Sequence, residues 1–297
     1  METIFTSDET ILKNIDSFEP SHIFKCGQAF RWDELEDGSF INVAFNRVFR
    51  VYRDGDDIHL EGVDEEFYNA HLVDYFDLNR SYLDIKAHLS KDETLKEAML
   101  YGEGIRILNQ EPFEIIITFI ISANNNIKRI KNSIREISRM YGEKIENPYG
   151  EYYAFPTMEA LSKADPKDLR EFAKVGFRDE RIVKASQMIL NGEVEMDPLF
   201  TMDLELAREE LMKLPGVGPK VCDCILLFAF KRSESFPVDV WIKRVMEELY
   251  FKKEVKKSEV ATLGREYFGK SAGFAQQYLF FYGRDNKLGV KWWRDLL

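Results

Sequence analysis

The stretch that decides the fold reads Leu214-Pro215-Gly216-Val217-Gly218-Pro219-Lys220, and it joins two segments with helical periodicity, 204–213 and 219–231. The two glycines allow a sharp reversal, because a residue without a side chain accepts backbone angles that others avoid. Pro219 suits the first position of the second helix. Backbone N–H groups then point outward at a helix start, an arrangement that binds phosphate. The window predicts a hairpin of two helices whose amides form an anion site suited to a phosphate group.

Lys220 lies in the first turn of the second helix, directly after the glycine turn. The helix dipole and apolar neighbours both disfavour a charged ammonium there. A nucleophilic amine has to be uncharged, so this position suits covalent catalysis. The sequence fits equally well a lysine that only contacts a phosphate group.

Asp239 follows Phe236-Pro237-Val238 and opens another helical segment, 239–250. One interpretation is an N-cap, because aspartate accepts hydrogen bonds from free amides at a helix start. The other is catalytic, because a carboxylate held in place stabilises a developing sugar cation or moves a proton. Asp239 lies nineteen residues after Lys220, and the two residues at this spacing form a more specific motif than either residue alone.

Net charge first argues against a nucleic-acid partner, because the chain of 297 residues carries 41 basic and 52 acidic side chains. The acidic excess is local: residues 1–100 hold 10 basic and 22 acidic side chains, whereas 101–297 hold 31 and 30. The charge therefore excludes a broad basic DNA-binding surface but leaves DNA chemistry open. A hairpin that binds through its amides needs few lysines.

Cysteine content points to a reducing compartment, because three cysteines are too few for a disulfide framework. Three are also too few for a four-cysteine iron–sulfur cluster, so none is expected. The N-terminus lacks a basic segment followed by an apolar one, and the longest apolar runs are too short to span a membrane. We expect a cytoplasmic protein without a membrane partner, and a monomer.

The pattern along the chain predicts an α+β protein in two parts, 1–105 and 106–297. In the first part, alternating segments flank Asp37-Gly38 and Asp54-Gly55, which are turns typical of hairpins, so an antiparallel sheet is expected over about 18–62. From Glu65 onward the periodicity is helical. Thirteen helices are expected, near 65–75, 80–88, 92–101, 112–122, 126–140, 157–163, 166–174, 179–190, 203–213, 219–231, 239–250, 256–268 and 271–283.

The combined motif resembles the HhH-GPD superfamily of DNA base-excision glycosylases. Members of the endonuclease III branch carry a four-cysteine cluster that this chain lacks, and the alkylation-repair branch lacks the lysine that it has. What remains resembles 8-oxoguanine DNA glycosylase/lyase. The matching segments span almost the whole chain: 26–32 (Cys-Gly-Gln-Ala-Phe-Arg-Trp), 124–127 (Asn-Asn-Asn-Ile), the hairpin through Cys224, 237–239 (Pro-Val-Asp), and 272–280.

By this resemblance, Lys220 is the nucleophile and Asp239 stabilises the sugar cation. The resemblance assigns reading of N7–H, which 8-oxoguanine has and guanine lacks, to the backbone carbonyl of Gly27. Gln276 would bind the Watson–Crick edge of the flipped base, and Cys224 and Phe280 would cover its two faces. From burial statistics alone, Phe280 reads as an ordinary core residue.

The resemblance also implies contacts to the opposite strand. Asn124 would fill the space left by the flipped nucleotide, and Arg129 and Arg178 would bind the orphaned cytosine. Phe177 would be the wedge beside it, in place of the commoner tyrosine. Without the resemblance, 122–126 reads as a polar turn with Asn126 as the N-cap of the next helix.

A structural ion at the hairpin is a further implication of the resemblance. The carbonyls of Met212, Leu214 and Val217 would hold a monovalent or calcium ion, and no other cofactor is expected. Trp241 stands where the family often has a histidine, which implies different phosphate or solvent contacts.

These inferences predict a bifunctional glycosylase/lyase that excises 8-oxoguanine from duplex DNA, preferably opposite cytosine. Base flipping would precede attack of Lys220 on C1′, and a Schiff base would lead to β-elimination. The alternatives are an HhH-GPD glycosylase for another damaged base and a non-catalytic protein that binds DNA structure through the hairpin.

Overall fold

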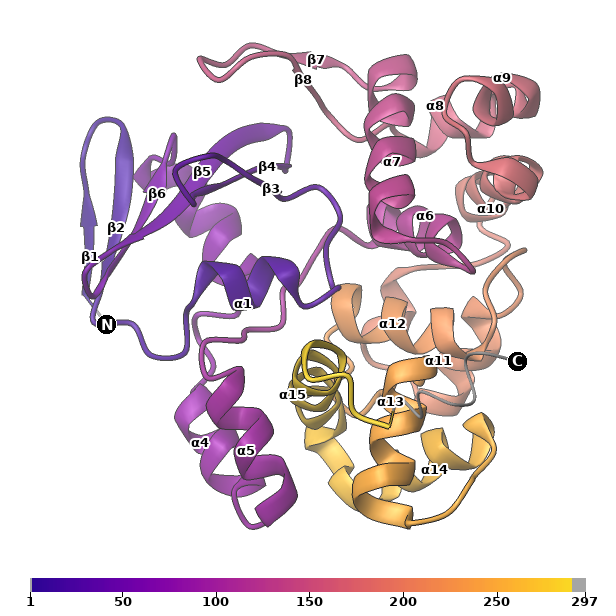
Figure 1. Ribbon diagram of the computed structural model, residues 1–297. Coiled ribbons are helices and arrows are strands. Elements are labelled where there is room, and N and C mark those ends of the chain that lie inside the picture. Colours follow the sequence, from indigo (N-terminus) through magenta and orange to yellow (C-terminus); the bar gives the residue numbers. More distant parts are fainter. Residues whose placement is uncertain (1, 290–297) are drawn as a thin grey trace.

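The computed structural model describes residues 2–289. A β-sheet with three short helices forms one side of the molecule, and a larger group of helices forms the other (Figure 1). The predicted order, an antiparallel sheet followed by helices, is confirmed. Within residues 2–289, no helix is long and apolar enough to cross a membrane.

The sheet has six antiparallel strands in the order β1-β2-β6-β5-β4-β3. Their bounds are β1 Glu2–Phe5, β2 Glu9–Lys13, β3 Asp33–Glu34, β4 Phe40–Ala44, β5 Arg47–Asp54 and β6 Asp57–Glu61. Gly38 and Gly55 have positive φ, as the predicted turns require. The hairpin of β1 and β2 was not predicted. The alternating segment 29–32, one of those that flank Asp37-Gly38, is not a strand, because β3 begins only at Asp33.

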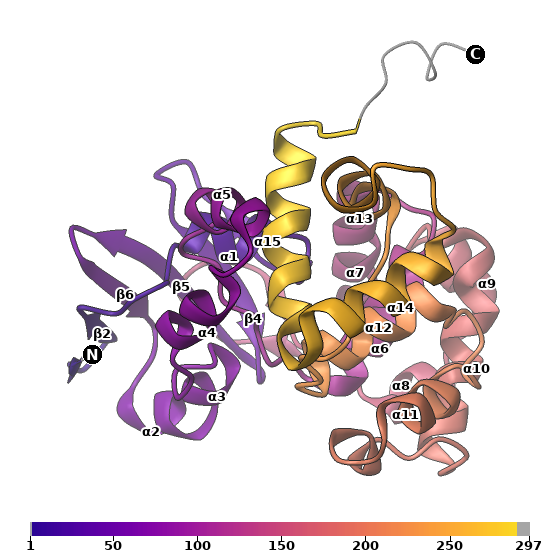
Figure 2. The same ribbon diagram turned by 90° about the horizontal axis from the view of Figure 1, so that it is seen from below.

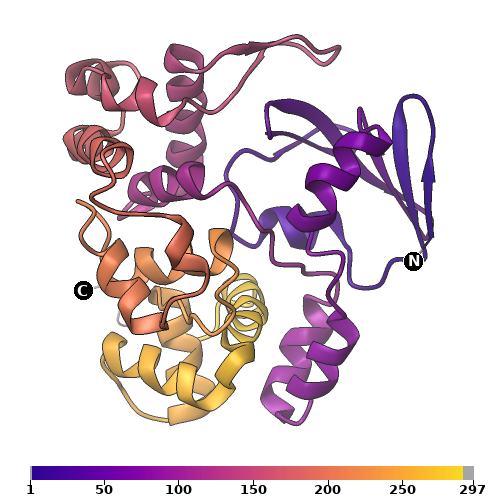
Figure 3. The same cartoon turned by 180° about the vertical axis from the view of Figure 1, so that it is seen from behind.

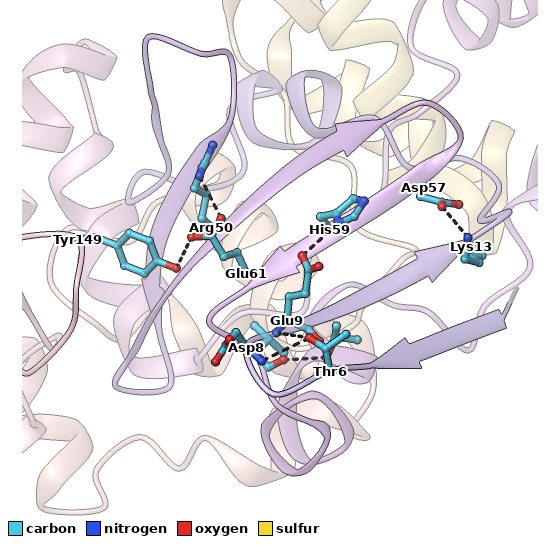
Figure 4. A network of polar contacts seen from close by, with 11 residues as sticks. Thr6, Asp8, Glu9, Lys13, Arg50, Asp57, His59, Glu61 and Tyr149 are labelled. Atoms are coloured by element: carbon cyan, nitrogen blue, oxygen red, sulfur yellow. Dashed lines mark hydrogen bonds and ion pairs between the residues drawn. The ribbon is translucent and has the colours of Figure 1, made fainter.

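The two faces of the sheet differ in chemistry. One face covers an apolar core closed by α1 (Pro20–Lys25), α2 (Glu65–Phe67), the π-helical η1 (Tyr68–Leu72) and α3 (Val73–Tyr75). The other carries cross-strand polar pairs, Lys13–Asp57, His59–Glu9 and Arg50–Glu61 (Figure 4). Tyr149, from the loop between β7 (Lys144–Ile145) and β8 (Tyr152–Tyr153), donates a hydrogen bond of 2.8 Å to Glu61. The β7–β8 hairpin thus ties the helical part to the sheet.

The remaining helices follow the predicted periodicity closely. They are α4 Tyr82–Leu89, α5 Glu93–Tyr101, α6 Pro112–Ser122, α7 Ile127–Tyr141, α8 Met158–Ser162, α9 Pro166–Glu171, α10 Asp179–Leu190, α11 Leu204–Leu211, α12 Pro219–Ala229, α13 Val240–Val245, α14 Lys257–Phe268 and α15 Ala272–Asp285. Shorter 3₁₀ or π segments are η2 Gly176–Arg178, η3 Asp197–Phe200, η4 Met246–Phe251 and η5 Gly269–Ser271. Helices α6 and α12 are almost wholly buried, which explains their long apolar runs.

Helix α15 runs between the sheet side and the helical side, so it contacts both (Figure 2). It approaches α12 closely at Gly273, where a side chain would collide with Leu227. Helices α4 and α5 share the buried core of the helical part, although the predicted border at residue 105 placed them in the first part. That border stays a prediction.

The segment 105–111, which has no regular secondary structure, connects the two parts of the molecule (Figure 3). The backbone N–H of Asn109 donates to Tyr75 in α3, and that of Gln110 donates to Phe228 in α12. Consecutive residues therefore bond to opposite parts, and this fixes how the parts meet.

Candidate active site

The predicted hairpin is present between α11 and α12. Gly216 has a φ of +94°, and a side chain there would press on Arg181 and Ile120 at 3.2 Å. Gly218 is the N-cap of α12, with open space around its Cα, and Pro219 occupies the first helical position. Gly216 thus lies on the side of the turn that packs against other residues, and Gly218 lies on the side that is open. This geometry allows the amides at the start of α12 to approach a phosphate.

Lys220 lies in the first turn of α12, half-buried, with its Nζ 5.4 Å from the centre of the Phe119 ring. Phe119 belongs to the buried helix α6 and also stacks on Phe228 of α12. The amine therefore lies over the ring of a buried phenylalanine. An amine in this setting is positioned for attack on a group brought to the hairpin.

Asp239 is the N-cap of α13, where its side chain accepts a 2.8 Å hydrogen bond from the N–H of Ile242. The N-cap interpretation is thus confirmed, and it does not compete with a catalytic one. The bond uses one carboxylate oxygen and fixes the orientation of the group. The half-buried carboxylate keeps its other oxygen for a ligand.

Cys224 brings these two groups together, because both act on its thiol. Burial raises the pKa of Cys224, the hydrogen bond and positive charge of Lys220 oppose that rise, and the negative charge of Asp239 adds to it. All three cysteines carry free thiols, as expected. Lysine, thiol and carboxylate therefore form one cluster at the starts of α12 and α13.

A second group of residues, which we call the Gly27 wall, comes from the turn after α1 and from α15. Gly27 follows α1 with a φ of +79°, and a Cβ on it would lie 3.2 Å from Cε1 of Phe280 in α15. Phe280 is only partly buried, unlike Leu279 and Phe281 beside it. Phe30, three residues after Gly27, packs edge-on against Phe119, under the amine of Lys220. The structure therefore places Gly27 and Phe280 in contact and links them to the lysine through two aromatic rings.

Gln276 lies one turn before Phe280 on α15. Its side chain is 4% exposed and accepts a 2.9 Å hydrogen bond from Gln277. The side-chain oxygen of Gln277 is buried and has no hydrogen-bond partner within residues 2–289. The two amides are buried among side chains of α15 that are mostly apolar.

The predicted contacts to the opposite strand form a separate cluster at the start of α7. Asn124 is exposed and has a φ of +51°. Arg178 is buried and donates hydrogen bonds to the carbonyls of Ala123 and Asn124, so it braces this turn. Phe177 is 54% exposed and stacks against the guanidinium of Arg178 at 4.3 Å. An exposed aromatic ring beside a braced loop is suited to insertion between bases.

Arg129 lies in the first turn of α7, exposed, and its N–H donates to the N-cap Asn126. The predicted N-cap is thus confirmed. At the hairpin, the N–H of Val217 donates 3.1 Å to the carbonyl of Leu214, which keeps its second lone pair. Met212 is the C-cap of α11. Among residues 2–289, no cluster of three or more histidine, cysteine or acidic side chains could hold a metal.

Sequence reasoning missed the residues that hold the Gly27 wall in place. Gln28 is fully buried and binds three backbone groups, and Gln110 binds the carbonyl of Gln28. Arg284, on the last turn of α15, donates to the carbonyl of Lys25 and lies over the rings of Phe280 and Phe281. Gln28 lies inside a quoted motif, but no local pattern shows that residue 110 is its partner.

A helical hairpin with an amine and a carboxylate at the starts of consecutive helices is typical of a DNA base-excision glycosylase. Comparison with known families agrees. Residues 10–116 match the N-terminal domain of 8-oxoguanine DNA glycosylase, and residues 117–270 match the HhH-GPD superfamily of base excision DNA repair proteins.

Known proteins resemble the chain over most of its length. A probable N-glycosylase/DNA lyase of Methanothermobacter thermautotrophicus is 34% identical over 72% of this chain and 74% of its own. The N-glycosylase/DNA lyase of Saccharomyces cerevisiae is 31% identical over 77% and 68%. The crystal structure of Clostridium acetobutylicum 8-oxoguanine glycosylase/lyase, with double-stranded DNA containing cytosine opposite 8-oxoG, is 42% identical. It covers 97% of this chain and 99% of that one, with a TM-score of 0.94.

The chain therefore belongs to the 8-oxoguanine DNA glycosylase/lyase family of the HhH-GPD superfamily. The predicted family, fold class and glycosylase/lyase activity are confirmed. The roles of individual residues stay predictions, which the geometry described above supports.

Proposed function

We propose that the protein excises 8-oxoguanine from duplex DNA and prefers cytosine opposite the lesion. The observation that carries this proposal is the close approach of Phe280 to Gly27, in a turn linked to Lys220 through the packed rings of Phe30 and Phe119. A flipped base would enter between Phe280 and Cys224, with its edge toward Gln276. The Gly27 carbonyl would accept the N7–H of 8-oxoguanine, whereas the N7 of guanine is itself an acceptor and would be left unpaired.

The proposed chemistry needs only the amine and the carboxylate. Lys220 Nζ forms a bond to C1′, and the base leaves with the electron pair of the glycosidic bond. Asp239 stabilises the positive charge that develops on the sugar. Opening of the sugar ring gives a Schiff base, loss of a C2′ proton follows, and the 3′ phosphate leaves by β-elimination. No cofactor takes part.

Selectivity for the opposite base would come from the cluster around Asn124. Asn124 would occupy the space of the flipped nucleotide, and Phe177 would insert beside the orphaned base. Arg129 would bind cytosine. Arg178 already donates to three backbone carbonyls, those of Ala123, Asn124 and Val175, so its contact with cytosine would use a guanidinium that also braces the turn.

The direct test is borohydride trapping of the protein on an 8-oxoguanine:cytosine duplex. Wild type should give a covalent complex and the Lys220→Gln variant none, because the amide cannot form a Schiff base. Trapping that persists in this variant would remove Lys220 from its role. Excision opposite each of the four bases, and on duplexes with oxidised pyrimidines or alkylated bases, tests the substrate. Faster excision of another lesion would favour an HhH-GPD glycosylase for another damaged base. Binding without any excision would favour a non-catalytic protein that binds DNA structure.

We further propose that a monovalent or calcium ion binds the carbonyls of Met212, Leu214 and Val217. Backbone carbonyl oxygens suit such ions, and these three belong to the C-cap of α11 and to the turn that follows it. Affinity for duplex DNA should be higher in potassium, sodium or calcium salts than in tetramethylammonium at equal ionic strength. Equal affinities in all four would oppose the ion.

The proposal extends to a monomer that works in the reducing cytoplasm. The reducing compartment is supported by the three free thiols, because Cys222 and Cys224 are separated by one residue on α12 and are not joined. Light scattering after size-exclusion chromatography should give the mass of one chain, 34.8 kDa. A mass of two chains would contradict it.

A further inference from the structure

The turn that carries Gly27 is held by a network of buried amides. The side-chain nitrogen of Gln28 donates to the carbonyls of Ile23 (3.0 Å) and Arg106 (2.7 Å). Its side-chain oxygen accepts from the N–H of Leu108 at 2.8 Å. Its own backbone carbonyl accepts from the side chain of Gln110 at 2.9 Å. Gln28 is 0% exposed, so water cannot replace these bonds.

This network leaves the Gln28 amide a single orientation. A flipped amide would set its oxygen against two carbonyls and its NH₂ group against the N–H of Leu108. Gly27, by contrast, has no side chain to fix it and is the most freely rotating residue of the turn. The direction of the Gly27 carbonyl therefore depends on the hydrogen bonds that hold Gln28 in place.

The same network reaches the helix that carries the amine. The backbone N–H of Gln110 donates 2.9 Å to the carbonyl of Phe228, on the last turn of α12. Lys220 lies eight residues earlier on that helix, about 12 Å along its axis. The Gly27 turn is thus connected to the amine in three steps. The side chain of Gln110 bonds to Gln28, the backbone of Gln110 bonds to Phe228, and α12 leads from Phe228 back to Lys220.

We infer that Gln28 and Gln110 are positioning residues that set the Gly27 carbonyl relative to Lys220, and that they thereby determine which base is excised. The inference rests on the proposed function, in which this carbonyl reads the lesion. A shift of about 1 Å at a reacting group lowers rates by about 100-fold. An abasic sugar has no base for the Gly27 carbonyl to recognise. Cleavage at an abasic site should therefore not depend on the two glutamines.

The test compares two rates in each variant: excision of 8-oxoguanine opposite cytosine and β-elimination at a preformed abasic site, both under single-turnover conditions. Gln110→Met removes the bond to Gln28 but keeps the backbone bond to Phe228. We expect excision to fall about 10- to 100-fold while β-elimination stays within about twofold of wild type.

Asn109→Leu is the matched control. Asn109 is buried beside Gln110 and donates one side-chain bond of 2.8 Å to a backbone carbonyl, that of Asp74, away from the Gly27 turn. Both rates of this variant should stay near those of wild type. Equal losses of both rates in Gln110→Met, or no loss of either, would overturn the inference.

Gln28→Glu provides a second readout. An ionised carboxylate cannot donate a hydrogen bond to the backbone carbonyls of Ile23 and Arg106. A protonated carboxyl group donates to one of these two carbonyls. Excision by this variant should therefore recover, relative to wild type, as the pH falls, with no matching change in β-elimination. A constant ratio to wild type across pH would contradict the positioning role. Failure of the proposed function looks different, because wild type itself would then not excise 8-oxoguanine.

Discussion

The two walls of the proposed base pocket are built in different ways. On the helical side, Lys220 and Asp239 lie at helix starts, and each is placed by the first turn of its own helix. On the sheet side, Gly27 lies in a turn whose hydrogen bonds come from residues near 106–110. Reactive groups are thus fixed by local structure, whereas recognition depends on contacts distant in sequence. Substitutions that affect one wall without the other can test this division.

The largest effect is expected for Asp239→Asn on the chemical wall. Asparagine caps a helix about as well as aspartate, so the bond to Ile242 and the fold should persist. The charge that stabilises the sugar cation is lost, and excision should fall by about 10²–10⁴-fold. Single-turnover kinetics and a thermal melt measure both quantities. Asp165→Asn, the same change at the N-cap of α9, should alter neither. Near-normal excision by Asp239→Asn would leave Asp239 as a cap only.

Gly27→Ala tests the recognition wall. The new methyl group would lie 3.2 Å from the Phe280 ring and so intrude where a flipped base would enter. The positive φ also strains alanine by about 1–2 kcal/mol. We expect excision to fall about 10- to 1,000-fold, since misplacement of a substrate by 1 Å alone costs about 100-fold, while cleavage of a preformed abasic site persists.

The control for that variant is Gly38→Ala. Gly38 has a similar φ of +83°, but a Cβ there meets nothing within 4 Å. It carries the same backbone strain without the intrusion. If both alanine variants lose excision equally, strain and not the pocket explains the effect, and the contrast between the two walls is lost.

Prediction from sequence succeeded where the signal was local. The hairpin glycines, the lysine in the first turn of α12 and the N-cap aspartate are encoded within a few residues, and the structure has them as expected. The β1–β2 hairpin was missed because it lacks a glycine turn. Gln110 and Arg284 were missed because their partners, Gln28 and Lys25, lie 82 and 259 residues away. No periodicity records a contact over such a distance.

Phe177→Ala tests a third region, the loop that would contact the opposite strand. The ring is 54% exposed, so its loss should leave the melting temperature unchanged. Stacking of an aromatic side chain on a base contributes about 1–3 kcal/mol, so duplex affinity should fall about tenfold. Phe172→Ala removes a ring that is 52% exposed at the C-cap of α9 and should leave affinity unchanged. Equal losses in the two variants would mean that any exposed ring matters, and the wedge role would be wrong.

The smallest effect concerns the contact between the parts that carry the two walls. Glu114, in the first turn of α6, pairs with Arg31 from the sheet side at 3.1 Å. Burial raises the pKa of Glu114 to about 7, Arg31 opposes the rise, and Glu111 adds to it. The folded protein therefore binds this proton more tightly than the unfolded chain. The resulting stability is fully present below about pH 4.5 and is lost as pH rises through about 7.

Glu114→Gln should remove that part of the pH dependence. Between pH 5 and pH 8, wild type should lose about 1–3 kcal/mol more unfolding free energy than this variant, as measured by urea denaturation across pH. Glu259→Gln changes a carboxylate in the first turn of α14, where it is exposed, and should keep the wild-type slope. The pocket walls themselves contain neither residue, so excision at a fixed pH should change little. A wild-type slope in Glu114→Gln would mean that Arg31 keeps the carboxylate ionised, and that the two parts are joined by a permanent ion pair.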